Sequence, residues 1–112
     1  MASEMHGGRG YVYCLRYQVV WCVKNRHKVL TEEIAAELEN ILRKIANDNK
    51  FSILEFKADK DYVRILIDCS PQHFIPDMMK AIKGVSARIL MKKFGGGLRQ
   101  KLWGGHLWNP SY

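Results

Sequence analysis

Polar and apolar side chains alternate along Asp61-Tyr62-Val63-Arg64-Ile65-Leu66-Ile67-Asp68, and the rest of the chain is arranged around this stretch. A period of two is typical of a half-buried strand, so we expect one face of it to enter a core. Residues two apart on one strand face stand side by side. Tyr62 and Arg64 therefore form a pair on the opposite face, where both can act on one ligand.

The composition indicates a single basic domain. The chain has 112 residues, of which 47% are hydrophobic, enough for a modest core. Its 18 Lys and Arg residues against 11 Asp and Glu residues give a formal charge of +7. Such an excess on a small domain favours a polyanionic partner, with nucleic acid first and an anionic membrane surface second.

The sequence favours a cytoplasmic protein without a membrane span. No apolar run approaches the roughly 20 residues that cross a bilayer, and residues 1–10 lack the apolar core of a secretory signal. Cys14, Cys22 and Cys69 make an odd count without Cys-x-x-Cys spacing, so neither a disulfide framework nor a zinc knuckle is indicated. We expect reduced thiols instead.

Two strands and a helix are predicted before the central stretch. Residues 11–23 read as a long strand with apolar residues on both faces, so it lies centrally or at an interface. The basic turn 24–28 is either a solvated loop or a contact with backbone phosphates. Thr31 then caps a helix with an apolar stripe, and residues 51–58 form the second strand. The order strand, helix, strand, strand predicts a split β-α-β unit.

A second helix is predicted over residues 75–94. Gly84 costs this helix roughly 1 kcal/mol against Ala, which indicates close packing, close approach by a ligand, or a glycine that is simply tolerated. Gly95-Gly96-Gly97 is expected to end the helix, and its context does not match a phosphate-binding loop. The buried stripe is expected to comprise Ile75, Met79, Ile82, Val85 or Ser86, Ile89 and Phe94.

The tail of the chain is aromatic and basic. It places Trp103 and Trp108 around two glycines and His106. Indole rings beside basic residues can stack on unpaired bases, but we favour plain core packing for both tryptophans. For His106 a structural or DNA-contacting role is favoured over metal binding.

Several of these motifs, taken together, resemble one family. They are Gly8-Arg9-Gly10-Tyr11, the segments 20–24 and 26–30, Ile82-Lys83-Gly84-Val85-Ser86-Ala87-Arg88, and the run from Lys101 to Tyr112 that contains Leu-Trp-Gly-Gly-His-Leu-Trp-Asn-Pro-Ser-Tyr. In this order they are similar to motifs of the single-tyrosine HUH transposases, small insertion-sequence proteins that move DNA as a single strand. The resemblance runs from about Gly8 to the end of the chain.

The resemblance implies an α+β, ferredoxin-like (RRM-like) fold, with an antiparallel sheet and two helices packed on one side. It implies one nucleic-acid-binding domain over residues 11–112. The preceding segment 1–10 is rich in glycine and is expected to be flexible. Members form homodimers through the first strand and recognise hairpins. They cut and rejoin single-stranded DNA through a phosphotyrosine bond, with Mg or Mn held by a His-hydrophobic-His motif on the third strand.

This chain departs from the family pattern at the metal site. The two histidine positions fall on Tyr62 and Arg64, and a phenol is a poor ligand for Mg or Mn while a guanidinium has no lone pair to offer. We therefore expect no metal and no cofactor. The catalytic helix of the family lies beyond Tyr112, which belongs to the Pro-Ser-Tyr motif and is not read as the nucleophile.

These observations predict a catalytically inactive protein that binds hairpin or single-stranded DNA. Arg64 would replace the metal as a fixed cation and Tyr62 would stack on a base or donate a hydrogen bond, unless both residues are drift in a decaying gene. The alternatives are a dimerisation partner or inhibitor of an intact transposase and, less favoured, an active strand-transfer enzyme. The predicted nucleic-acid-binding residues are Arg9, Tyr62, Arg64, Lys80, Lys83, Arg88 and His106.

Overall fold

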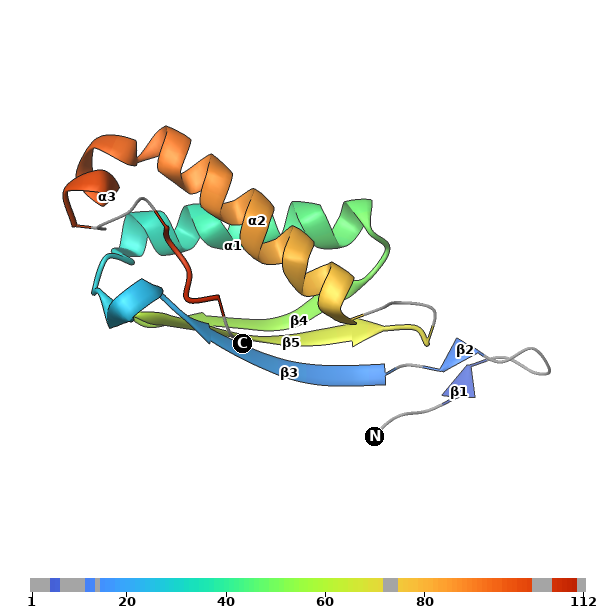
Figure 1. Ribbon diagram of the computed structural model, residues 1–112. Helices are drawn as coiled ribbons and strands as arrows, with labels where there is room; N and C mark the ends of the chain where they lie inside the picture. The colour runs from blue at the N-terminus through green and yellow to red at the C-terminus, as the bar shows by residue number, and fades with distance from the viewer. Residues whose placement is uncertain (1–4, 7–11, 14, 72–74, 102–105, 111–112) are drawn as a thin grey trace.

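The structure, a computed structural model, describes residues 5–6, 12–13, 15–71, 75–101 and 106–110 (Figure 1). Its elements along the chain are β1 (Met5–His6), β2 (Val12–Tyr13), β3 (Leu15–Cys22), the 3₁₀ turn η1 (Lys24–Arg26), α1 (Glu32–Asp48), β4 (Ser52–Ala58), β5 (Tyr62–Cys69), α2 (Ile75–Lys93) and α3 (Gly95–Lys101).

An antiparallel sheet of three strands in the order β3-β5-β4 carries the fold. Helices α1 and α2 lie side by side over one face of this sheet, while its other face carries none of the described helices (Figure 1). The predicted α+β class, with an antiparallel sheet and two helices on one side, is confirmed. The strand predicted over 61–68 is present as β5, and it is this strand that lies at the centre of the sheet. The first long strand, expected to lie centrally or at an interface, is the edge strand β3.

The alternation along β5 separates two environments. Val63, Ile65 and Ile67 are at most 1% exposed, because they pack between the sheet and the two helices. Side chains on the other face stay partly exposed. We call this other face the open face; by strand register it comprises Arg16, Gln18, Val20, Cys22, Ser52, Glu55, Lys57, Tyr62, Arg64, Leu66 and Asp68.

Helix α1 begins as its sequence predicts. The Thr31 hydroxyl accepts a hydrogen bond from Ile34 N at 3.2 Å, which satisfies one of the amides left free at a helix start. Glu32 and Glu33 follow in the first turn, where the helix dipole favours anions. The predicted apolar stripe is buried: Ile34, Leu38, Ile41, Leu42 and Ile45.

The second half of α2 differs from the prediction. The buried residues of this helix are Met78, Met79, Ile82, Ser86 and Leu90. Ile89, predicted to be buried, is 36% exposed, because the buried stripe continues at spacings of four residues from Ile82 through Ser86 to Leu90.

Helix α2 ends at Lys93, next to the three glycines that were predicted to end it, but these glycines begin a further helix, α3, that was not predicted. Phe94 N donates to Leu90 O at 2.8 Å and Leu98 N donates to Phe94 O at 3.1 Å, so backbone bonding continues into α3. Leu98 is 2% exposed, and its burial offsets the low helix propensity of glycine.

The N-terminal region differs in detail from the expected single long strand. Residues 12–13 and 15–22 form two strands, β2 and β3. Met5–His6, in the segment expected to be flexible, pairs with β2 as the antiparallel strand β1. Arg9 lies outside the described residues. In the part of the chain that is described, no helix is both long and apolar enough to cross a membrane.

Candidate nucleic-acid interface

Tyr62 and Arg64 lie on the open face of the central strand. Tyr62 stands opposite Cys22 of β3, and Arg64 stands between Val20 of β3 and Lys57 of β4. Both side chains are half-buried. The alternation of side chains along β5 thus places a phenol and a guanidinium side by side on a surface that solvent can reach.

The charged side chains of the open face are unevenly paired. Arg16 stands opposite Asp68, which matches opposite charges across two strands. Lys57 instead stands opposite Arg64, which places two cations together. Around them lies a hollow of about 510 Å³, whose lining includes Gln18 and Glu55 as well. This arrangement offers several hydrogen-bond donors and an excess of positive charge to an anion.

Asp61, just before Tyr62, fixes the basic turn beside this strand. Its carboxylate accepts a hydrogen bond from Arg26 Nε at 3.0 Å, and its backbone carbonyl accepts from Val23 N at 2.9 Å. The hydrogen bond and the negative charge of Asp61 raise the pKa of Arg26 above its ordinary value. Arg26 is therefore ion-paired, although its side chain is 60% exposed.

The segment His106–Pro110, which we call the C-terminal segment, pairs with the end of β3. Asn109 N donates to Cys22 O at 2.9 Å and Lys24 N donates to Leu107 O at 2.8 Å. Val23 and Trp108 form an antiparallel bridge between these two bonds. The C-terminal segment thus covers the last part of the outer edge of β3.

Trp108 anchors the C-terminal segment in the core. Its ring meets that of Trp21 edge to face, with centroids 5.7 Å apart and planes at 85°. Trp108 is 6% exposed and its Nε1 donates to the Ser86 hydroxyl at 3.0 Å. Core packing is therefore confirmed for Trp108, whereas Trp103 lies outside the described residues.

Lys83 holds the same segment from α2. Its ammonium group donates to Asn109 O at 2.6 Å, and partial burial lowers the pKa of Lys83 below its ordinary value. Beside it, a Cβ at Gly84 would have no atom within 4 Å, so close packing does not explain this glycine. Lys83 and Gly84 line a groove of about 360 Å³ together with Lys24 and the exposed His106.

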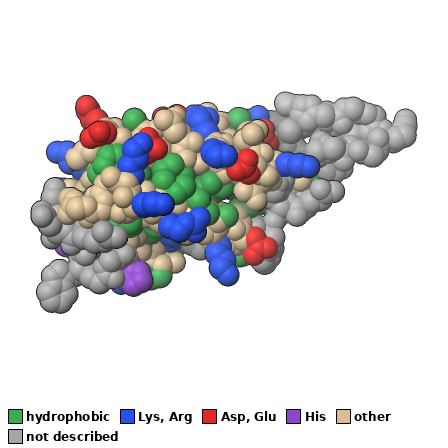
Figure 2. Space-filling model, turned by 90° about the horizontal axis from the view of Figure 1, so that it is seen from above, with side chains coloured by type: hydrophobic (Ala, Val, Ile, Leu, Met, Phe, Trp, Pro, Cys, Tyr) green, Lys and Arg blue, Asp and Glu red, His purple; other side chains and the backbone are tan. Residues whose placement is uncertain are grey.

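The predicted binding residues divide between two surfaces. Tyr62 and Arg64 are on the open face, but Lys80, Lys83 and Arg88 belong to α2, which packs on the other face. Figure 2 shows that helical side, where Lys and Arg side chains are spread among acidic and apolar ones. The fold does not bring the two sets into one phosphate track.

Sequence reasoning missed Lys57, Glu55 and Gln18 on the open face. Strand β4 carries a register irregularity between Ile53 and Glu55. A bulge reverses the alternation, so the facing of residues beyond it does not follow from the pattern alone. The signal that was available was Lys57 itself, a cation in a strand predicted to neighbour the central one.

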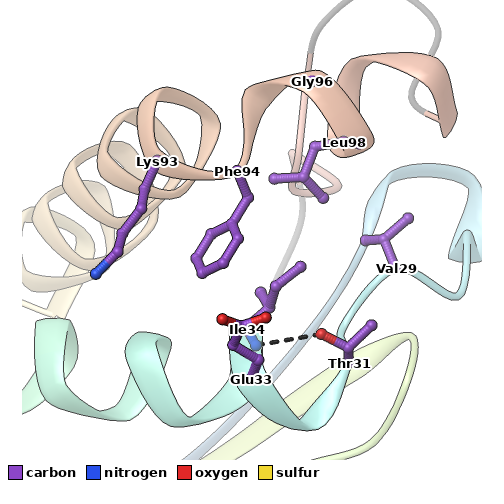
Figure 3. Close-up of a pocket in the computed structure, with 9 residues that line it drawn as sticks. Val29, Thr31, Glu33, Ile34, Lys93, Phe94, Gly96 and Leu98 are labelled. Atoms are coloured by element: carbon purple, nitrogen blue, oxygen red, sulfur yellow. Dashed lines mark hydrogen bonds between the residues drawn. The ribbon is translucent and has the colours of Figure 1, made fainter.

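A third hollow, of about 430 Å³, lies between the start of α1 and the junction of α2 and α3, and it shares no lining residue with the hollow on the open face. Phe94 points from the junction toward Ile34, and the Thr31 cap lies at its edge (Figure 3). Lys93, at its rim, pairs with Glu37 of α1 at 3.2 Å. The lining is largely apolar and offers no grouping of cations.

Among the described side chains, no three His, Cys, Asp or Glu residues gather closely enough to hold a metal ion. The open face offers cations, a phenol and the amide of Gln18, beside the carboxylates of Glu55 and Asp68. Chemically, such a surface suits a phosphate and a planar ring.

Comparison with known proteins places this fold in a family. Residues 11–112 match the family model described as "Transposase IS200 like". The ISDra2 transposase TnpA of Deinococcus radiodurans is 50% identical over 109 residues, which cover 97% of this chain and 77% of that protein. The transposase for insertion sequence element IS200 of Salmonella typhimurium is 27% identical over 97 residues, covering 87% of this chain and 63% of that relative.

The likeness extends to three dimensions. A 1.90 Å crystal structure from Deinococcus radiodurans, described as a transposase, superposes with a TM-score of 0.86 at 48% identity. The match covers 96% of this chain and 82% of that one. The family model spans nearly the whole chain, and the sequence and structure matches agree with it. This chain belongs to the IS200-like transposase family.

Proposed function

We propose that this protein binds hairpin or single-stranded DNA on its open face, without the divalent metal of active relatives and without cutting the strand. The observation that carries this proposal is the placement of Tyr62 and Arg64. They occupy the open face of the central strand, at the positions that the family resemblance assigns to two metal-binding histidines.

The residues at these positions do not fit Mg or Mn. Both ions prefer carboxylate, carbonyl or water oxygens, and the imidazole nitrogens of the family motif also supply lone pairs. A guanidinium supplies none and stays cationic, so Arg64 repels a divalent ion. The nearby Cys22 thiol, opposite Tyr62, is a soft ligand that does not make up the loss.

The same residues suit a nucleic acid strand. A guanidinium can hold a phosphate through two parallel hydrogen bonds. A half-buried tyrosine on a sheet can stack against an unpaired base, as aromatic side chains do on other single-strand-binding sheets. The formal charge of +7 adds attraction that does not depend on sequence.

Fluorescence anisotropy on the purified protein tests the binding, with hairpin, single-stranded and duplex oligonucleotides at rising salt. We expect hairpin or single-stranded DNA to bind more tightly than duplex, with affinity falling linearly on a log-log salt plot. Arg64→Met should weaken binding, whereas Arg64→Lys should retain part of it because the charge remains. The absence of any preference over duplex at low salt would overturn the proposal.

The loss of metal chemistry is tested separately. We expect no binding heat when Mg or Mn is titrated into the protein in a calorimeter, and no covalent protein–DNA band on a denaturing gel. A metal-dependent covalent band would show an active strand-transfer enzyme and contradict the inactive assignment. An intact relative that carries both histidines serves as the positive control.

A second candidate function, pairing with another transposase chain, is favoured by the edge of β3. β3 is at one end of the sheet order, and the C-terminal segment covers only its last residues. Since Cys22 O points outward to Asn109, the N–H and C=O groups of Val20, Gln18 and Arg16 also point outward.

The opposite edge is less suited to pairing. β4 carries the irregularity at Ile53, and Arg43 Nη1 donates to Ile53 O at 2.8 Å, which occupies an edge carbonyl. We therefore propose that a second copy, or an intact relative, adds through β3. Light scattering after size exclusion should give a dimer mass, and co-purification with a tagged relative should yield a mixed dimer. Val20→Pro, which removes an outward N–H, should reduce both.

A further inference from the structure

We propose that Lys57 and Arg64 together form a phosphate subsite on the open face, and that it takes a backbone phosphodiester of a single nucleic acid strand. The subsite deepens the proposed function and rests on it for the identity of the molecule that carries the phosphate. Lys57 was not among the residues that the sequence singled out. Its role follows from strand register.

The first observation is the direct pairing of two cations across neighbouring strands. Lys57 of β4 and Arg64 of β5 are register partners, and such residues have Cβ atoms roughly 5 Å apart on the same face. The acids that lie in ion pairs elsewhere in the described chain, Asp61, Glu39, Asp48 and Glu37, pair with other cations. Among the described side chains, none forms an ion pair with Lys57 or Arg64.

Like charges placed directly opposite each other in a sheet repel. A phosphate between them removes the repulsion and accepts charge-assisted hydrogen bonds from both, which are shorter and stronger than bonds between neutral groups. The guanidinium offers a planar fork and the ammonium a point charge, so the pair can hold both non-bridging oxygens of one phosphate.

The second observation is the hollow that surrounds the pair. It measures about 510 Å³ and is lined by residues of all three strands of the sheet. Gln18 of β3 stands opposite Leu66, and its exposed side-chain amide adds a neutral donor across the hollow from Lys57. Arg43 also reaches the rim, but its guanidinium is already bound to Glu39 and to Ile53 O.

Glu55 lowers the net positive charge of the hollow. This carboxylate also lines the hollow, opposite Leu66 and two residues from Lys57. Two free cations, Lys57 and Arg64, against one carboxylate leave a local charge of +1. A phosphodiester carries one negative charge, so one bound phosphodiester neutralises this local charge.

Three variants of the full chain test the subsite: one should weaken nucleic acid binding, one should strengthen it, and one is a control that should leave it unchanged. Lys57→Met should weaken binding of a single-stranded oligonucleotide roughly threefold to fivefold, and should lower the salt slope by about 0.7, the value for one lost phosphate contact. Glu55→Gln should strengthen binding by a similar factor. Lys44→Met, on α1 and away from the open face, should leave affinity and slope unchanged apart from its general charge effect.

A small phosphodiester tests the phosphate subsite independently of nucleic acid binding. Dimethyl phosphate is titrated into the protein while the side-chain nitrogen signals of Arg64 and Lys57 are followed by NMR. We expect both signals to shift in the wild type, and the Arg64 shift to shrink in Lys57→Met, whose fold is checked by its backbone spectrum.

The two failures are distinguishable. If dimethyl phosphate shifts the two signals but no oligonucleotide binds, the subsite stands and the nucleic-acid function fails. If an oligonucleotide binds and Lys57→Met keeps the wild-type salt slope, the subsite is overturned and the function stands. Unchanged signals at both side chains with dimethyl phosphate also overturn the subsite.

Discussion

Trp108 donates a hydrogen bond from Nε1 to the Ser86 hydroxyl at 3.0 Å, and this bond joins the C-terminal segment to α2 within the core. Ser86 is fully buried, and Trp108 nearly so. The motif 82–88 and residues 106–110 of the second motif, which the sequence singled out separately, therefore pack against each other. Their shared role in this structure is to position the end of the chain against the sheet.

Ser86→Ala should destabilise the fold, because it leaves the buried indole N–H of Trp108 without its acceptor. The expected loss is about 1–3 kcal/mol in the free energy of unfolding, measured by urea denaturation. Ser52→Ala, at an exposed strand position, is the control and should change stability little. An equal effect of both substitutions would contradict the buried hydrogen bond.

Lys83 should make stability depend on alkaline pH in a defined direction. Its folded-state pKa is lowered from 10.5, chiefly because burial disfavours the ammonium form. The unfolded chain therefore binds this proton more strongly, so the contribution of Lys83 to stability rises as pH increases toward about 10.5. Urea denaturation of wild type and Lys83→Met over this range checks the sign.

The difference between the two proteins isolates Lys83 from other groups that titrate at high pH. The free energy of unfolding of wild type minus that of Lys83→Met should increase with pH. A flat or falling difference would show that the ammonium gains as much from Asn109 O as it loses by burial.

Lys57→Thr should stabilise the fold while it weakens nucleic acid binding. Removal of the like-charge pair with Arg64 is expected to add about 0.2–1 kcal/mol at low ionic strength, and threonine suits a strand. The electrostatic part of the gain should shrink at high salt, because salt screens exposed charges. Thermal or urea unfolding of wild type, Lys57→Thr and the charge-retaining Lys57→Arg measures it.

Thr31→Ala should destabilise α1 through the loss of its cap. The hydroxyl accepts from Ile34 N, so its removal should cost about 0.5–2 kcal/mol in chemical denaturation. Thr31→Ser keeps the oxygen and should retain most of the stability. Equal losses in both variants would mean that the methyl group of Thr31, rather than the cap, matters.

The sequence predicted those strands and helices whose pattern of polar and apolar residues follows from which of their own faces is buried. Strict alternation located β5 and its two faces, and a helical stripe with a capping threonine located α1. The pattern failed where tertiary packing overrides local preference. Gly95–97 enter α3 because Leu98 is buried, and Ile89 lies outside the stripe that continues to Leu90.

For the candidate site, the pair Tyr62 and Arg64 could be read from one strand, but their neighbours could not. The pairing of Lys57 with Arg64 depends on the register between β4 and β5 and on an irregularity that shifts it. The separation of the α2 lysines from this pair depends on which face of the sheet the helix covers. Neither relationship could be predicted from residue spacing along the sequence, because both depend on how separate strands and helices pack together.

The protected edge of β4 also limits how far this sheet can extend. Arg43 occupies the Ile53 carbonyl and the irregularity bends the strand there, so further chains add poorly on that side. If two copies pair through β3, each uses the free edge of its three-stranded sheet on the other. Assembly then closes at a two-fold pair, and this three-stranded sheet, as far as the structure describes it, leaves no second free edge for open-ended fibre growth, the usual hazard of exposed strands.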